Sequence, residues 1–168
     1  MKPTHERSNV LFAAAAIAAV AVSVALLGCG DDDDELNAAE DACEHMKEGP
    51  SQAVTAATDN TGDAPDIGEE HTRFDITLSG QDSYIDLVID EEGEFTVFMD
   101  KSVPIAVSTS SGAPVAAEQT NSNVTECAEV SIGHTFDFEV GTYSVNFGST
   151  AEQQVRLVVV HEGEHMHE

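Results

Sequence analysis

The chain has 168 residues, with 32 aspartates and glutamates against only 6 lysines and arginines, giving a formal net charge of -26 at pH 7. This length gives room for one domain with extensions. A surface this negative repels phosphate groups, so a nucleic-acid-binding protein is close to excluded, as is a protein that adheres to anionic lipid headgroups.

Residues 1–28 have the features of an export signal. Lys2 and Arg7 form a basic start, and residues 10–27 are apolar except for one serine. An apolar run of this length also overlaps the lower limit for a membrane-spanning helix. An uncleaved anchor helix is therefore the alternative to a cleaved signal peptide.

Residues 26–29 read LLGC, which resembles the lipobox of bacterial lipoproteins. The resemblance implies cleavage before Cys29, a diacylglyceryl group on its thiol and a fatty acid on its new amino group. Residues 29–35 would then be a lipidated acidic tether to the membrane. It also implies the bacterial cell envelope. Because Gly30, and not aspartate, follows Cys29, the outer membrane or cell surface is favoured, and a periplasm-facing location is the alternative.

Two of the three cysteines remain once Cys29 is lipidated. An even number of cysteines in an exported chain favours a disulfide, here between Cys43 and Cys127. The bridge would close a loop of about 84 residues and contribute roughly 4.5 kcal/mol in the chain-entropy model. Two free thiols, or a copper site that uses Cys43, are the alternatives.

The segment 36–58 is predicted to be helical. Apolar residues fall on one face of 36–48 at spacings of three and four, and Gly49 and Pro50 end this helix. The Ala-rich residues 51–58 are expected to add a turn or two. Residues 59–70 contain glycines and a proline without an apolar period, which predicts a linker.

From residue 71 to 160 the apolar period is two, which predicts seven or eight half-buried strands. Turn signals recur about every ten residues, a spacing typical of an antiparallel β-sandwich, Ig-like or jelly-roll-like. Pro104 predicts that the strand around 103–107 lies at an edge, and residues 124–132 are expected to form a strand that carries Cys127. The predicted inward-facing residues are Phe74, Ile76, Leu78, Ile85, Leu87, Ile89, Phe95, Val97, Met99, Val103, Ile105, Val107, Phe136, Phe138, Val140, Tyr143, Val145, Phe147, Val155, Leu157 and Val159.

Within this region, residues 139–145 read EVGTYSV and residues 92–97 read EGEFTV. Both segments resemble strands of bacterial pre-peptidase C-terminal domains. The likeness covers about 71–160, although residues 103–107 lack the strand sequence common in that family. Those domains are non-catalytic accessory modules of exported proteins, so the resemblance implies a sandwich that is not an enzyme.

The tail 161–168 begins with HEGEH, which matches the H-E-x-x-H pattern of zinc proteases. The pattern needs a helix, but here it follows a predicted strand and contains Gly163. The tail instead suggests a copper or zinc site, because imidazole suits both ions and a thioether suits cuprous ion. Solvated polar residues are the alternative. The candidate ligands are His161, His165, His167 and Met166, with His134 and His71 from strand starts.

These features predict a membrane-anchored, exported bacterial lipoprotein with a non-catalytic β-sandwich that binds a partner or has a structural role. The alternative is a periplasmic or surface copper- or zinc-binding protein that uses the C-terminal tail. An enzyme is not expected, because no catalytic constellation is diagnostic in the sequence. The predicted contact with the membrane is through the lipid anchor alone.

Overall fold

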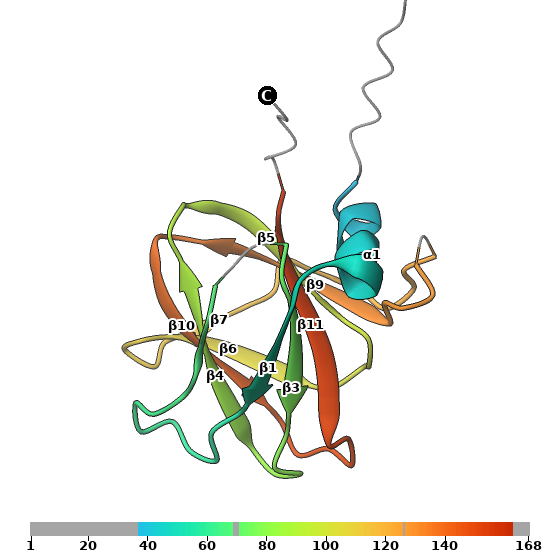
Figure 1. Ribbon diagram of the computed structural model, residues 1–168. Helices are drawn as coiled ribbons and strands as arrows, with labels where there is room; N and C mark the ends of the chain where they lie inside the picture. Colours follow the sequence, from blue (N-terminus) through green and yellow to red (C-terminus); the bar gives the residue numbers. More distant parts are fainter. Residues whose placement is uncertain (1–36, 69–70, 126, 163–168) are drawn as a thin grey trace, which may run out of the picture. The chain divides into compact units, whose positions relative to one another are not determined.

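The computed structural model describes residues 37–68, 71–125 and 127–162 (Figure 1). These residues form one helix and two β-sheets that pack as a sandwich. The elements are α1 (Ala38–Glu48), β1 (Ser51–Thr55), β2 (Asp66–Ile67), β3 (Arg73–Thr77), β4 (Ser83–Ile89), β5 (Gly93–Met99), β6 (Ile105–Thr109), β7 (Pro114–Val115), β8 (Gln119–Asn121), β9 (Ile132–Phe138), β10 (Gly141–Phe147) and β11 (Gln154–His161).

The first sheet has the strand order β1-β3-β11-β5-β9-β8, and the second has the order β2-β4-β10-β6-β7. Pairing is antiparallel except for the short β1 and β2, which run parallel to β3 and β4. From β3 to β6, and again from β9 to β11, each strand lies in the sheet opposite its predecessor. The predicted mainly antiparallel β-sandwich is therefore confirmed.

The main core lies between the two sheets and contains most of the residues with period-two spacing. Phe74, Leu87, Phe138 and Leu157 are each at most 1% exposed. Val140 is the clear exception among the predicted core residues, because it is 64% exposed in the connection from β9 to β10. There the chain crosses between sheets, and the Tyr143 hydroxyl fixes the corner by bonding the backbone N–H and C=O of Glu139.

A second apolar cluster lies on the outer face of the first sheet, beneath α1. Met46 of the helix packs with Phe98 of β5 and with Val158 and Val160 of β11. Both faces of the central strands β5 and β11 are therefore largely buried. Period-two patterning alone misses this layer, because a strand buried on both faces has a near-continuous apolar sequence.

The predicted disulfide between Cys43 and Cys127 is present and joins α1 to the loop before β9, with 5.5 Å between the Cα atoms. Residues 124–132 were expected to form a strand that carries Cys127. The described residues before 132 form loop and turn instead, and β9 begins only at Ile132. The loop lies against α1, where Cys127 and Val130 contribute to the second cluster.

The helix is shorter than predicted. The Asn37 side chain caps its first turn in a capping box with Glu40, and Gly49 and Pro50 follow its last turn. Residues 51–55 form β1, not further helix, because they pair in register with β3 and satisfy their backbone hydrogen bonds there. The predicted linker contains the short strand β2.

The edge position predicted from Pro104 is also wrong. This proline precedes β6, which lies between β10 and β7 and so is not at the sheet edge. Since Pro104 is outside the strand, its missing N–H removes no bond from the ladder.

None of the described helices is both long and apolar enough to cross a membrane.

Phe138→Ala should lower the free energy of unfolding by about 3–5 kcal/mol, since this side chain is 1% exposed in the main core. Val140→Ala, two residues later and 64% exposed, is the matched control and should change it by less than about 0.5 kcal/mol. Urea unfolding of both variants measures the difference. Equal losses would show that the core lies elsewhere.

Candidate metal centre

Two donors of the candidate site lie one helical turn apart on α1. Asp41 and His45 are separated by four residues, a spacing that places both side chains on the same helix face. The Nε2 atom of His45 lies 3.2 Å from the Oδ1 atom of Asp41. Asp41 is only 7% exposed, and its Oδ2 atom has no hydrogen-bond partner among the described residues.

The third donor is His71, just before β3. Its Nδ1 atom lies 3.0 Å from Nε2 of His45 and 3.4 Å from Oδ2 of Asp41. His71 has φ of 58°, a left-handed conformation that histidine adopts more often than most residues but that still costs backbone energy. Among the described non-glycine residues it alone has positive φ. The sequence-predicted ligand therefore faces the helix from a strained backbone position.

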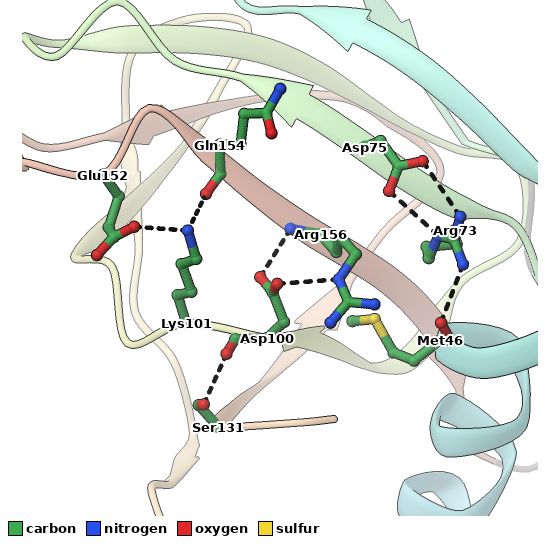
Figure 2. Close-up of polar contacts among 9 residues, drawn as sticks. All are labelled: Met46, Arg73, Asp75, Asp100, Lys101, Ser131, Glu152, Gln154 and Arg156. Carbon is green, nitrogen blue, oxygen red and sulfur yellow. Dashed lines mark hydrogen bonds and ion pairs between the residues drawn. The ribbon is translucent and has the colours of Figure 1, made fainter. Parts of the chain in front are cut away.

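Arg73 holds the two ligand-bearing segments together, as Figure 2 shows. Its guanidinium donates to the Met46 carbonyl at 3.0 Å, one residue after His45, and its backbone N–H donates to the Pro50 carbonyl at 2.9 Å. Asp75 accepts two further bonds from the same guanidinium and fixes its orientation. The end of α1 is thereby fixed beside the start of β3, two residues after His71.

The three donors lie close enough together to hold one ion. Zinc bonds imidazole nitrogen at about 2.0–2.1 Å, so the donors of a tetrahedral site lie about 3.3–3.4 Å apart. His45 Nε2 lies 3.0 Å from Nδ1 of His71 and 3.2 Å from Oδ1 of Asp41, whereas the 3.4 Å contact of His71 is with the other oxygen, Oδ2. With one donor atom taken from each residue, all three lie within 4.8 Å of one another. Two imidazoles and a carboxylate form a ligand set that suits zinc and copper(II). Without an ion, the two imidazoles share a hydrogen bond between Nδ1 of His71 and Nε2 of His45.

The other histidines named from the sequence do not join this cluster. The His161 ring stacks on Phe95, with 4.3 Å between ring centroids. His134 contacts the Thr120 hydroxyl at 3.0 Å through Nδ1. His134 is on β9, and β11 and β5 separate β9 from β3, so His71 and His134 do not lie on neighbouring strands. His165, Met166, His167 and the lipidation residue Cys29 lie outside the described residues.

A second group of metal-ligand residue types, Cys43, Cys127 and Glu129, is not a thiolate site. Both sulfur atoms are joined in the disulfide, so neither is a thiolate that could bind copper or zinc. The alternative in which Cys43 serves a copper site is therefore excluded in the oxidised protein.

Asp41 and His45 were not predicted as ligands. Their four-residue spacing on a predicted helix was the available signal, but such pairs are common on solvated helix faces. What distinguishes this pair is His71, which is 26 residues from His45 in the chain and 3.0 Å away in space. Only the docking of α1 beside β3 brings the three residues together.

Burial and neighbouring charges shift the pKa of groups outside this cluster. Burial, and then repulsion from Asp66, raises the pKa of Asp86 on the second sheet. A hydrogen bond to Glu162 and repulsion from that carboxylate raise the pKa of Glu94. Burial lowers the pKa of His134, because the protonated ring loses hydration.

No protein-family model matches the chain, and no curated protein is similar to it in sequence.

The lowered pKa of His134 predicts a pH dependence of folding. As pH falls below about 6.5, the unfolded chain takes up the proton at this residue before the folded chain does, so the folded state loses stability. His134→Gln should therefore lose less stability than the wild type between about pH 7.5 and 5.5. Urea unfolding at both pH values measures this, and an unchanged difference would contradict it.

Proposed function

We propose that the protein is a membrane-anchored, exported bacterial lipoprotein whose β-sandwich is a non-catalytic binding or structural module of the cell envelope. The observation that carries this proposal is the Cys43–Cys127 disulfide, which follows the lipobox-like residues 26–29 in the sequence. Structural disulfides persist in oxidising compartments outside the cytoplasm, which is where a lipobox would direct the chain. The outer membrane or cell surface is the location favoured by Gly30.

Within this proposal the sandwich is jelly-roll-like. The order β3-β11-β5-β9 opposite β4-β10-β6-β7 supports this assignment over an Ig-like one. In this order the first long strand, β3, pairs with the last, β11. Most successive strands also alternate between the two sheets, as in a double Greek key. The resemblance of residues 139–145 to pre-peptidase C-terminal domains is compatible with an accessory role, and these residues include the start of β10.

A non-catalytic role is favoured over a zinc protease because of where the H-E-x-x-H pattern begins. His161 is the last residue of β11, and its ring stacks on Phe95. A zincin requires both histidines of the pattern on one face of a helix. The first histidine is therefore in the wrong secondary structure for that chemistry.

The second candidate function is copper or zinc binding in the envelope. The contacts of His71 with His45 and Asp41 favour it, because one sequence-predicted ligand lies within 3.4 Å of two further donor atoms. This moves the proposed centre from the tail to the junction of α1 and β3. The strongly negative charge of the chain would raise the local concentration of any cation.

Cys29→Ala should abolish incorporation of labelled fatty acid and leave the precursor uncleaved, because the lipid is attached through this thiol. A variant with Cys43 and Cys127 both replaced by alanine is the control and should keep the label. Labelling in growing cells, followed by gel electrophoresis, measures both. Equal labelling of Cys29→Ala and wild type would rule out the lipoprotein assignment.

The full chain in detergent should bind about one equivalent of zinc or copper(II) in isothermal titration calorimetry. His45→Gln and His71→Asn should each weaken binding at least about tenfold, since each removes one ligand. Asparagine is chosen because it tolerates the left-handed backbone at position 71. His134→Gln is the matched control. Binding unaffected by the first two variants would place the ion elsewhere.

A further inference from the structure

A row of oxygen-bearing side chains crosses the outer face of the second sheet, on the opposite side of the sandwich from α1. In this row Asp66 of β2 lies directly opposite Asp86 of β4, and Asp86 lies directly opposite Ser144 of β10. Side chains alternate between the two faces of a strand. All three therefore point outward, because the next residue of each strand lies in the main core, namely Ile67, Leu87 and Val145.

Ser144 carries a buried hydroxyl group without a partner. The residue is only 7% exposed, and its Oγ atom makes no hydrogen bond to any described residue. Neither of its cross-strand neighbours, Asp86 on one side and Ser108 on the other, bonds it. A polar group that is removed from water without a partner destabilises the folded state. A ligand on this face that the Ser144 oxygen can contact would remove that cost.

The two carboxylates of the row have no positive charge beside them on this sheet. The backbone N–H of Asp86 donates to the Pro65 carbonyl at 2.9 Å, which fixes β2 beside β4 and keeps Asp66 next to Asp86. The five strands of the second sheet contain no lysine, arginine or histidine. The ion pairs among the described residues include neither aspartate. Burial, and then repulsion from Asp66, raises the pKa of Asp86, and a bound cation would relieve that repulsion.

We propose that Asp66, Asp86 and Ser144 bind a calcium ion on the outer face of the second sheet. Calcium takes roughly six to eight oxygen ligands in flexible geometry, whereas magnesium demands a near-ideal octahedron. Neighbouring strands lie about 4.8 Å apart, so an ion over Asp86 would have Asp66 on one side and Ser144 on the other, with water completing its shell.

This site is separate from the zinc or copper cluster at α1. Its ligands are oxygen atoms only, whereas the cluster at α1 contains two imidazoles, which suit zinc and copper. The two sites also lie on opposite sheets, since α1 packs on the first sheet and the calcium site is on the second. The inference therefore does not rest on either function proposed above.

The test measures calcium binding by the full chain in neutral detergent, at physiological ionic strength, with isothermal titration calorimetry. The test variants are Asp66→Asn/Asp86→Asn and Ser144→Ala. Glu94→Gln/Asp137→Asn is the charge-matched control, because these two acidic residues also lie directly opposite one another on neighbouring strands, but in the first sheet. Thermal melting without calcium shows whether each variant folds.

The wild type should bind one calcium ion with a dissociation constant on the order of 10⁻⁴ to 10⁻³ M, as weak extracellular sites do. Asp66→Asn/Asp86→Asn should bind at least about tenfold more weakly, and Ser144→Ala roughly three- to tenfold more weakly, because a neutral hydroxyl is a weaker ligand than a carboxylate. The control pair should stay within about twofold of the wild type, because salt screens distant charges. Without calcium, Ser144→Ala should melt no lower than the wild type, since alanine leaves no unpaired hydroxyl.

Equal weakening in the test pair and the control pair would assign the binding to the general negative charge of the chain and overturn the site. Wild-type affinity in Ser144→Ala would overturn the three-ligand site, because the hydroxyl would then not contact the ion. Heats without saturation in the wild type would overturn calcium binding altogether. None of these results depends on zinc or copper binding at α1.

Discussion

The packing of α1 against the outer face of the first sheet is the interaction on which the candidate site depends. Apolar contacts of Met46 with Phe98, Val158 and Val160 hold the helix, and the Cys43–Cys127 bridge adds a covalent link to the loop beside it. The bridge spans 84 residues, so it restricts the unfolded chain strongly, by about 4.5 kcal/mol in the chain-entropy model. A helix of eleven residues would be marginal without such support.

Charge is distributed unevenly around this packed layer. The four basic residues of the described regions all form ion pairs on the side of the first sheet: Lys47 with Glu129, Arg73 with Asp75, Lys101 with Glu152, and Arg156 with Asp100. Figure 2 shows three of these pairs, and the pair of Arg73 with Asp75 lies beside the end of α1. Partly exposed pairs of this kind contribute little to stability, roughly 0–1 kcal/mol each. Their main effect is to hold neighbouring segments in place, as the bond from Arg73 to the Met46 carbonyl does.

The location of the site links the two proposals for function. A lipid on Cys29 would connect to the sandwich through α1, and α1 carries two of the three described donors. An ion bound there would join the helix to the start of β3, a second cross-link a few residues from the disulfide. Under both proposals, metal binding would stabilise the element through which a lipid anchor would hold the sandwich at the membrane.

The sequence by itself determined the class of fold and the cysteine pairing. Alternation of apolar residues identified β3, β4, β5, β9, β10 and β11, because each has one face in the same core. The even cysteine count was sufficient to pair Cys43 with Cys127, since only two candidates remained after Cys29. Local signals also located α1, because the apolar spacing of three and four and the final Gly-Pro act within a few positions.

Tertiary structure decided what depends on contacts between distant segments. Residues 51–55 form a strand only because β3 offers backbone partners, and Val158 and Val160 are buried only because α1 covers them. From the sequence, His71 was grouped with His134 and the tail histidines as candidate ligands, since all of them lie at or near the end of a predicted strand. The strand order separated His71 from His134, and the docking of α1 placed His71 against His45 and Asp41. A site made from two segments 26 residues apart has no spacing rule in the chain, because its geometry is set by how the helix docks on the sheet.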